Sequence, residues 1–363
     1  MYSIDIDTPQ PYRVHIGTFL LEQTGAISRE AAGGSKAIVV TDSNVAPLYS
    51  MPVKESLEQA GYDVKVFTFT AGEKHKRLGA VEAILEAMAA HHMTRSDLVV
   101  ALGGGVTGDM AGFAAATYMR GCPFVQVPTT LLAMVDSSVG GKTGVDLACG
   151  KNLAGAFWQP RAVIADVGCL ATLTPEQFAD GCGEVIKHAA IADESLFAEL
   201  EQTPLTYQLL LDDVARVAEL IARNIDIKRV VVVADEREGG IRKLLNFGHS
   251  IGHAIESSTD YALGHGACVG LGMVAIARAA HKLGACDASV QERIARAVIE
   301  HGLTIACPVD AQTVFESARH DKKCSGDTID LVIPHRIGAC SIDTVALEDF
   351  RQIIEMGLGP RMQ

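Results

Sequence analysis

The chain has 363 residues, 48% of them hydrophobic, and a formal net charge of −13. Chains longer than roughly 250–300 residues usually divide into two domains. The negative charge argues against nucleic-acid binding, which needs a contiguous basic face, and no run reaches the ~18 uncharged apolar residues of a membrane helix.

The N-terminal segment and the cysteines indicate a cytoplasmic protein. Residues 1–7 alternate like a strand and lack the basic start and apolar middle of a signal peptide. The nine cysteines form no C-x-x-C pair, so we expect reduced thiols in place of disulfides. No nucleic-acid or membrane partner is expected.

The first half of the chain alternates strand-like and helix-like segments. Hydrophobic runs predict strands at 37–41, 64–69 and 98–102, and helical periodicity predicts helices at 46–60 and 78–91. This alternation is typical of a mostly parallel sheet that binds ligands at the carboxyl ends of its strands. We therefore predict a Rossmann-like α/β nucleotide-binding domain over residues 1–174.

Glycine-rich or polar residues follow each predicted strand. The run Gly103-Gly104-Gly105 comes between a strand and a helix, where backbone amides can approach a pyrophosphate and the helix dipole favours negative charge. A glycine run alone is equally typical of a tight turn, but four such loops at one sheet edge predict a dinucleotide site. The residues that we expect to line it are Asp42, Asn44, Gly72, Glu73, Lys74, Gly104, Gly105, Val106, Thr107, Gly108, Asp109, Thr129 and Thr130.

Several cations lie in or near glycine-rich segments, although the chain is acidic. The segment around Lys142 looks like a phosphate loop but fails the Walker spacing, which excludes a nucleoside triphosphatase. Lys142 and the pair Lys151-Asn152 still suit contacts to a hydroxylated anion. We therefore expect an anionic small molecule as the partner. The cations concerned are Arg120, Lys142, Lys151, Lys187, Lys228, Arg242, Lys322 and Lys323.

Long helical periodicities dominate the second half. They predict helices at 175–192, 207–230, 242–257, 268–283 and 290–301, and a short helix after Leu347. Pro175 favours the first turn of a helix and marks the boundary. We therefore predict a mainly α-helical domain over residues 175–363.

This second domain contains a candidate metal site. His249 and His253 are four residues apart on a predicted helix, His265 follows in a glycine-flanked turn, and Glu184 lies on an earlier helix. Two imidazoles and one carboxylate leave a coordination position open for substrate, which is typical of catalytic divalent ions. The alternative is a pair of half-buried histidines satisfied by backbone partners.

Nine motifs in sequence order resemble the 3-dehydroquinate synthase family, and the resemblance runs from about Thr41 to Lys323. They are GGGVTGDMAGF at 103–113, MRG at 119–121, PTTLL at 128–132, DSSVGGKT at 136–143, GKN at 150–152, GEVIK at 183–187, DERE at 235–238, LNFGH at 245–249 and DKK at 321–323.

The resemblance implies a lyase of the shikimate pathway, which leads to chorismate and the aromatic amino acids. Such an enzyme converts 3-deoxy-D-arabino-heptulosonate 7-phosphate to 3-dehydroquinate and phosphate, using NAD transiently and a divalent ion, Zn²⁺ or Co²⁺. The implied fold is that of the iron-type alcohol dehydrogenases, with a nucleotide-binding domain followed by a helical metal-binding domain. A homodimer is also implied.

The resemblance also implies roles for individual residues. Glu184, His249 and His265 are the implied metal ligands, whereas His253 lies beside the substrate phosphate. The implied substrate contacts are Arg120, Lys142, Lys151, Asn152, Lys187, Lys228, Arg242, Asn246, His253 and one or both of Lys322 and Lys323. Further implied cofactor contacts are Lys76, Asp136, Lys142, Lys151, Cys169, Leu170, Ala171 and Thr172.

The chain departs from the family pattern at three positions. Ala267 follows Gly266 where a glutamate is usual, which removes a carboxylate that could orient a metal ligand. Gly183 replaces an alanine and Met134 a glutamine, both of which we interpret as packing changes.

Three other functions compete with this interpretation. Sugar-phosphate cyclases that make valiolone- or inosose-type products share the implied fold, but they usually depart from the DSSVGGKT pattern that is intact at 136–143. A polyol dehydrogenase would not need so many cations. A catalytically silent binding protein would not need all three proposed metal ligands.

Overall fold

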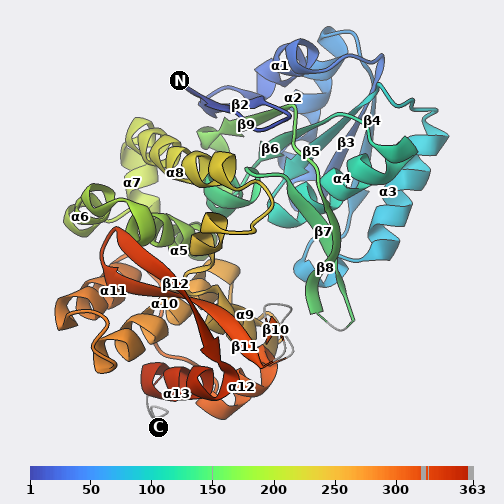
Figure 1. Ribbon diagram of the computed structural model, residues 1–363. Helices are drawn as coiled ribbons and strands as arrows, with labels where there is room; N and C mark the ends of the chain where they lie inside the picture. The colour runs from blue at the N-terminus through green and yellow to red at the C-terminus, as the bar shows by residue number, and fades with distance from the viewer. Residues whose placement is uncertain (149, 320–323, 326, 359–363) are drawn as a thin grey trace. The chain divides into compact units, whose positions relative to one another are not determined.

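The computed structural model describes residues 1–148, 150–319, 324–325 and 327–358, and the chain divides into two compact units (Figure 1). The first unit comprises Met1–Leu173 and Leu210–Val233, and the second comprises Thr174–Leu209 and Ala234–Gln363. The segment Leu210–Val233, which lies within the predicted helical domain, thus groups with the first unit. None of the described helices is long and apolar enough to cross a lipid bilayer.

A seven-stranded sheet forms the framework of the first unit, in the order β1-β2-β9-β6-β5-β3-β4. The strands are β1 (Tyr2–Ile6), β2 (Tyr12–Gly17), β3 (Lys36–Asp42), β4 (Asp63–Phe69), β5 (Leu98–Gly103), β6 (Phe124–Pro128) and β9 (Ala162–Asp166). β1 pairs with β2 antiparallel, and the other pairs are parallel. The predicted α/β fold is confirmed, because hydrophobic runs such as β5 are buried along their whole length.

Helices cover this sheet. They are α1 (Thr24–Ala31), α2 (Ala46–Gln59), α3 (Leu78–Ala90) and α4 (Gly105–Thr117). A further helix, α8 (Val214–Ala234), falls largely within the same unit. Ile38, Val40 and Val99 pack in one core cluster with Ile84 of α3 and Met110 of α4. Helices α1 and α2 contact each other and strands β3, β4 and β9.

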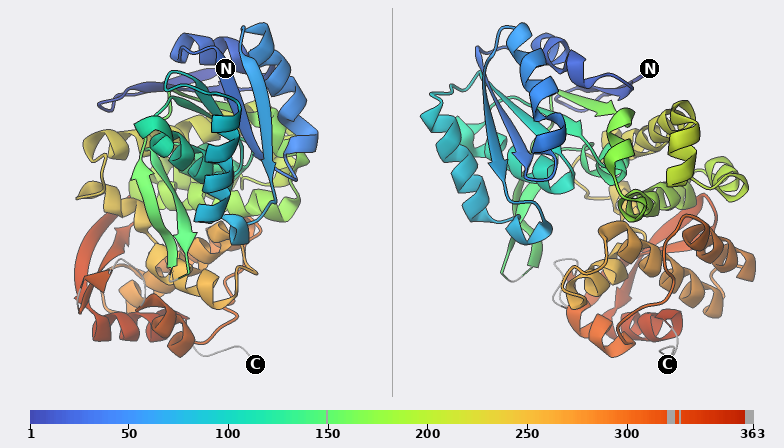
Figure 2. Two further views of the ribbon diagram at one scale, coloured as in Figure 1. Left: turned by 90° about the vertical axis from the view of Figure 1, so that its right-hand side faces the viewer. Right: turned by 180° about the vertical axis from the view of Figure 1, so that it is seen from behind.

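A β-hairpin in the first unit was not predicted. Its strands β7 (Lys142–Leu147) and β8 (Gly150–Phe157) pair antiparallel and project beyond the main sheet (Figure 2). Gly144 and Gly155 face each other, and a Cβ on Gly155 would lie 2.1 Å from the carbonyl oxygen of Thr143. The glycines that permit this close approach also hide the hydrophobic alternation of a strand.

Helix α10 lies at the centre of the second unit, where it contacts α5, α9, α11 and α13. The helices are α5 (Pro175–Ala192), α6 (Glu194–Gln202), α9 (His249–Ser258), α10 (His265–Lys282), α11 (Ala288–Glu300), α12 (Ala311–Ala318) and α13 (Leu347–Leu358). The short helix α7 (Tyr207–Asp212) crosses the boundary between the two units. Thr174 caps α5 in a reciprocal capping box with Gln177, so the helix begins at the predicted Pro175.

Two predicted helices in the second half were wrong, and one sheet was not predicted. The predicted helix 207–230 is two helices, α7 and α8. The predicted helix 242–257 is a 3₁₀ segment, η6 (Ile241–Asn246), followed by α9, because Gly248 breaks it with a φ of 80°. A three-stranded antiparallel sheet of β10 (Cys324–Ser325), β11 (Thr328–Arg336) and β12 (Ala339–Ala346) was missed.

Candidate active site

The predicted cofactor loops meet at one edge of the main sheet. The parallel strands β3, β4, β5, β6 and β9 run in the same direction, so the residues after their carboxyl ends lie along the same edge. These residues include Asp42, Asn44, Gly72, Glu73, Lys74, Gly104, Gly105, Thr129, Thr130, Cys169, Leu170, Ala171 and Thr172. The structure therefore brings together the loops that the sequence singles out.

The glycine loop between β5 and α4 is closely packed. A Cβ on Gly105 would lie 3.1 Å from Oγ of Ser137, and a Cβ on Gly108 would lie 2.6 Å from Oε1 of Gln126. Because Gly104 and Gly105 have no side chains, nothing on these two residues blocks a group that approaches the first backbone amides of α4. A partly exposed helix N-terminus at the carboxyl edge of a parallel sheet fits the pyrophosphate of a dinucleotide.

Asp42 organises the adjoining loop at the end of β3. Its Oδ1 accepts hydrogen bonds from the amides of Asn44 (2.8 Å) and Val45 (3.1 Å), and its Oδ2 accepts one from Oγ1 of Thr107 (3.4 Å). Tyr49, which the sequence did not indicate, links α2 to the loop after β9: its hydroxyl lies 2.7 Å from Oγ1 of Thr172.

A buried charge network attaches the hairpin to the loop after β4. Nζ of Lys76 lies 2.6 Å from Oδ2 of Asp109 and donates to Oδ1 of Asn152 at 2.6 Å. Nζ of Lys151 lies 2.9 Å from Oε1 of Glu73. Burial lowers the pKa of Lys76, but Asp109 and Glu73 outweigh it and raise the pKa above its ordinary value, so the lysine stays charged.

Asn152, a predicted substrate contact, is held in an unusual backbone conformation by this network. Its φ is 52°, in the left-handed region, and its amide donates to Oδ1 of Asp146 at 2.7 Å. Lys76 was predicted to contact the cofactor, but its contacts here also fix the side chain of Asn152.

Lys228 of α8 is brought to the glycine-loop side of the first unit. Its Nζ lies 2.5 Å from Oδ1 of Asp136 and donates to the carbonyl oxygen of the same residue at 2.6 Å. Asp136 lies on a π-helical turn (Ala133–Ser137), next to Ser137, which packs near Gly105. Lys142, at the start of β7, is exposed.

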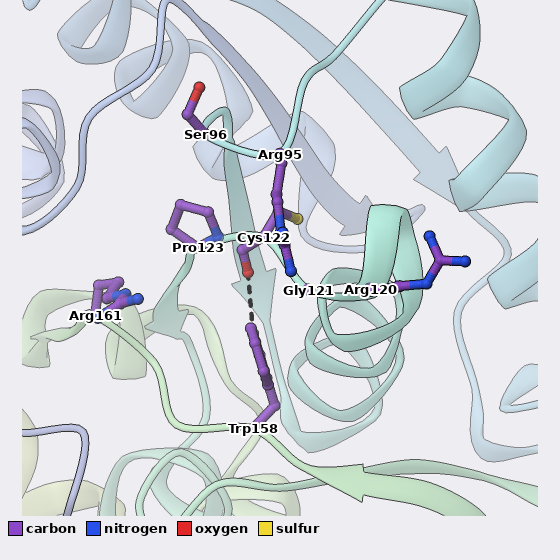
Figure 3. Close-up of a pocket in the computed structure, with 8 residues that line it drawn as sticks. All are labelled: Arg95, Ser96, Arg120, Gly121, Cys122, Pro123, Trp158 and Arg161. Atoms are coloured by element: carbon purple, nitrogen blue, oxygen red, sulfur yellow. Dashed lines mark hydrogen bonds between the residues drawn. The ribbon is translucent and has the colours of Figure 1, made fainter.

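Arg120 lies apart from the cofactor loops. It follows the carboxyl end of α4, and a helix rises ~1.5 Å per residue, so the 13 residues of α4 separate it from the glycine loop by about 20 Å. It lines a cavity of about 410 Å³ together with Arg95, Arg161 and Trp158 (Figure 3). The indole Nε1 of Trp158 donates to the carbonyl oxygen of Cys122 at 3.0 Å.

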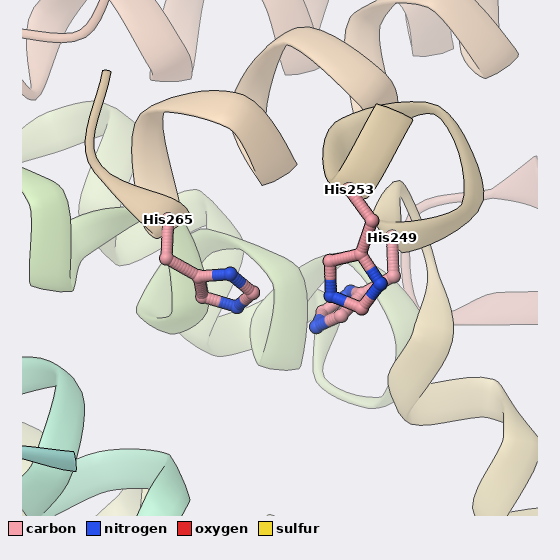
Figure 4. A group of neighbouring side chains, drawn as sticks. All are labelled: His249, His253 and His265. Carbon is pink, nitrogen blue, oxygen red and sulfur yellow. The ribbon is translucent and has the colours of Figure 1, made fainter. Parts of the chain in front are cut away.

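Three histidines of the second unit converge, and two of them face one carboxylate. Ring centroids of His249 and His253 lie 5.3 Å apart, those of His249 and His265 also 5.3 Å, and those of His253 and His265 5.5 Å (Figure 4). Oε1 of Glu184 lies 3.6 Å from Nε2 of His249 and 3.3 Å from Nε2 of His265. The geometry brings together the three predicted ligands and places His253 beside them.

Glycines allow the helices that carry these ligands to approach each other. A Cβ on Gly183 would lie 2.3 Å from the carbonyl oxygen of Gly266, so α5 and the start of α10 touch through their backbones. Gly183, which we interpreted as a packing change, thus lies directly beside Glu184, and Gly266 lies beside His265. His265, predicted in a turn, is the first residue of α10.

The cluster fits a divalent cation. The nitrogens of the three histidines lie within 4.8 Å of one another, and Glu184 is 0% exposed. Burial lowers the pKa of His265, but the carboxylates of Glu184 and Glu256 raise it to about 10. An imidazole that holds a proton at neutral pH in the apo protein is a place where a cation can supply the same counter-charge. Lys187, also buried, forms an ion pair with Glu184.

Two further predicted substrate contacts lie on η6. Arg242 is 1% exposed; its guanidinium donates to the carbonyl of Glu236, and its amide donates to Oδ2 of Asp235 at 3.1 Å. Nδ2 of Asn246 donates to Oε1 of Glu238 at 2.9 Å. The DERE motif therefore positions both residues. Lys322 and Lys323 lie outside the described residues.

Sequence reasoning missed Glu256, whose Oε2 lies 3.4 Å from Nδ1 of His265. A signal was present, because Glu256 is seven residues after His249 and lies on the same face of α9.

Comparisons with known proteins agree with this geometry. Residues 66–180 match the family model described as 3-dehydroquinate synthase N-terminal, and residues 181–324 match the one described as 3-dehydroquinate synthase C-terminal. A 3-dehydroquinate synthase of Streptococcus pneumoniae is 42% identical over 355 residues, which cover 97% of this chain and 99% of that protein.

Two solved structures resemble the whole chain. A 2-deoxy-scyllo-inosose synthase complexed with carbaglucose-6-phosphate, NAD⁺ and Co²⁺ has a TM-score of 0.88 and 25% identity, over 98% of this chain and 100% of that one. A 2-epi-5-epi-valiolone synthase of Streptomyces hygroscopicus subsp. jinggangensis with NAD⁺ and Zn²⁺ bound has a TM-score of 0.86 and 26% identity, over 96% and 95%. The predicted fold is confirmed, and the chain belongs to the 3-dehydroquinate synthase family.

Proposed function

We propose that the chain catalyses the 3-dehydroquinate synthase reaction, which converts 3-deoxy-D-arabino-heptulosonate 7-phosphate to 3-dehydroquinate and phosphate. The observation that carries this proposal is the cluster of His249, His253 and His265, in which His249 and His265 face the buried carboxylate of Glu184. That cluster occurs in a chain whose first unit presents a helix N-terminus fit for a dinucleotide.

The described residues fit both cofactors. Glu184, His249 and His265 would hold Zn²⁺ or Co²⁺, and the loops after β3, β4, β5, β6 and β9 would hold NAD. When bound, NAD accepts and returns a hydride, and the cation acidifies a substrate hydroxyl.

The cations and amides of the chain would bind and orient the anionic substrate. In the first unit these are Lys142, Lys151, Asn152 and Lys228, and in the second unit they are Lys187, Arg242 and Asn246. Charge-assisted hydrogen bonds from several directions fix the carboxylate, hydroxyls and phosphate in one orientation. His253, next to both proposed histidine ligands, would contact the substrate phosphate.

Two features favour this reaction over those of the related cyclases. The DSSVGGKT segment at 136–143 is intact. The chain is also 42% identical to a 3-dehydroquinate synthase, compared with 25% and 26% for the inosose and valiolone synthases.

An assay of phosphate release from the heptulosonate phosphate, with NAD in catalytic amount, tests the proposal. We expect many turnovers per NAD and no net NADH, whereas His265→Ala, the matched control, should release no phosphate above background. Accumulation of NADH without phosphate would indicate a dehydrogenase. Absence of both from metal-loaded protein would contradict the proposal.

We also propose that the protein is a cytoplasmic homodimer, as the family resemblance implies. Light scattering coupled to size exclusion tests the dimer, for which the expected mass is twice the 38.4 kDa of one chain. A mass of 38.4 kDa at assay concentration would contradict it.

A further inference from the structure

Glu256 is a buried carboxylate that lies against the histidine cluster of the second unit. It is 4% exposed. On α9 it follows His249 by seven residues and His253 by three, so the three side chains project from neighbouring positions on one face of the helix. Its Oε2 lies 3.4 Å from Nδ1 of His265, the residue that begins the next helix.

The imidazole of His265 lies between two carboxylates. Its Nδ1 faces Glu256, and its Nε2 lies 3.3 Å from Oε1 of Glu184. The ring is turned toward His249 and His253 (Figure 4). With 25% of its side chain exposed, it is the less enclosed of the two proposed histidine ligands, since 10% of the His249 side chain is exposed. An orienting partner therefore matters more for His265.

We propose that Glu256 is the residue that positions His265 for metal binding. Its carboxylate accepts the Nδ1–H of the imidazole, which fixes the tautomer and leaves the lone pair of Nε2 directed at the cation. Glu256 is a positioning residue and does not itself touch the metal or the substrate. This inference rests on the proposed function only through the assignment of His265 as a ligand.

Neighbouring groups have other tasks, which leaves Glu256 in this role. Ala267, two residues after His265, carries a methyl group where the family usually has a carboxylate. Oδ1 of Asp180 accepts a hydrogen bond from the amide of Ala267 at 2.9 Å, so that carboxylate holds the first turn of α10. Position 267 thus offers no carboxylate to His265, whereas Glu256, from the neighbouring helix α9, does.

The test is the affinity for Zn²⁺, measured by competition with a chromophoric chelator. Replacing the Glu256 carboxylate by the isosteric amide, Glu256→Gln, should raise the Kd by about 10–100-fold without changing the stoichiometry of one ion per chain. The visible absorption of the Co²⁺-substituted protein should change as well, because the orientation of one ligand is released. Glu201→Gln, which removes a carboxylate paired with Arg293 in the same unit, is the matched control and should leave both measurements unchanged.

A second variant keeps the proposal testable if Glu256→Gln does not fold. Glu256→Asp keeps the charge but withdraws the oxygen by one methylene, so its Kd should lie between those of the wild type and Glu256→Gln, with a similarly altered Co²⁺ spectrum. A purely structural role would lower the thermal stability of the apo protein and leave the Kd of the folded variants unchanged. A Kd within twofold of the wild type and an unchanged spectrum, in whichever variant folds, would overturn the proposal.

The failure of this inference and that of the proposed function can be distinguished. If the wild type binds Zn²⁺ but releases no phosphate, the proposed reaction is wrong, and the comparison of Kd values still decides the role of Glu256. If phosphate is released but Glu256→Gln binds Zn²⁺ normally, only the role of Glu256 is wrong.

Discussion

The two units of the chain differ in the groups that surround their buried charges. In the first unit each buried or half-buried lysine at the site has a carboxylate partner, as in the pairs Lys76–Asp109, Lys151–Glu73 and Lys228–Asp136. In the second unit, Glu184 is paired with Lys187 and also faces the imidazoles of His249 and His265, with His253 beside them. The first arrangement is complete before any ligand binds, whereas the second is suited to a cation.

This difference predicts different responses to ligands. Paired charges hold loops in place, and their value lies in positioning. Clustered ligand groups repel one another when protonated, so their ordering depends on the ion. We therefore expect the first unit to keep its structure and its cofactor affinity without metal, and the second unit to gain order when metal binds.

The largest expected effect is that of metal removal. After exhaustive chelation, phosphate release should fall by on the order of 10³-fold or more, because the acidified hydroxyl is lost. The affinity for NAD, followed by calorimetry, should stay within about twofold because the charges of the first unit are already paired. Zn²⁺ or Co²⁺ should restore turnover. If elemental analysis finds no metal in a protein that keeps full activity, the histidine cluster is not a catalytic metal site and the contrast between the two units is wrong.

The next effect separates the histidines within the cluster. His249→Ala should lose both the metal and the activity, whereas His253→Ala should keep the metal and lose mainly turnover. Metal content by elemental analysis, measured beside kcat, distinguishes the two. An equal loss of metal in both variants would make His253 a ligand, which its ring-to-ring distance of 5.3 Å from His249 permits.

In the first unit, Lys76→Met tests whether the paired charges stabilise the fold. Removing one partner of a buried pair leaves the other charge uncompensated, so the free energy of unfolding should fall by about 3–5 kcal/mol. Trp158, the only tryptophan in the chain, lies next to the hairpin and reports unfolding of this unit by fluorescence in urea. Lys54→Met, at a more exposed pair with Glu58, is the control and should cost at most about 1 kcal/mol. If the two changes lower the free energy of unfolding equally, the buried Lys76 network contributes no more stability than a surface ion pair.

The smallest expected effect concerns acid stability of the first unit. Burial raises the pKa of Asp97, but hydrogen bonds from the amides of Thr94, Lys36 and Ser35 outweigh it and lower the pKa below its ordinary value. A lowered pKa means that this stabilisation is present above the unfolded-state pKa of about 3.9 and is lost as the pH falls below it.

Asp97→Asn should therefore lower the free energy of unfolding by about 1–3 kcal/mol at pH 7, and by less in acid. Urea unfolding at neutral pH and at about pH 3, below the unfolded-state pKa, measures both values. If the free-energy difference between the wild type and Asp97→Asn grows as the pH falls, the pKa of Asp97 is raised in the folded protein and not lowered.

The sequence was sufficient for those parts of the fold that have strong periodicity. Hydrophobic runs located β3, β4 and β5, and the capping residue before Pro175 located the start of α5. Strand β11 was missed because Pro334 interrupts it, and proline is uncommon inside strands. The hairpin was missed because facing glycines replace the side chains that reveal a strand.

The site shows the same division. His249 and His253 could be paired from their spacing alone, because both lie on one helix. The approach of Glu184 and His265 depends on the contact between two helices, which no local pattern encodes. Asp146, Tyr49 and Glu256 were missed for the same reason, since each acts on a residue from a different element.

The backbone contact between Gly183 and Gly266 fixes the distance between α5 and the start of α10 at the metal site. Side-chain contacts can adjust by rotamer changes, but two backbones in contact have no such freedom. A Cβ at position 183 would lie 2.3 Å from the carbonyl oxygen of Gly266, so even alanine would push α5 and α10 apart. Glu184 and His265, one residue away from these glycines, would separate with them. In this chain the spacing between these two proposed ligands thus depends on two residues that have no side chain.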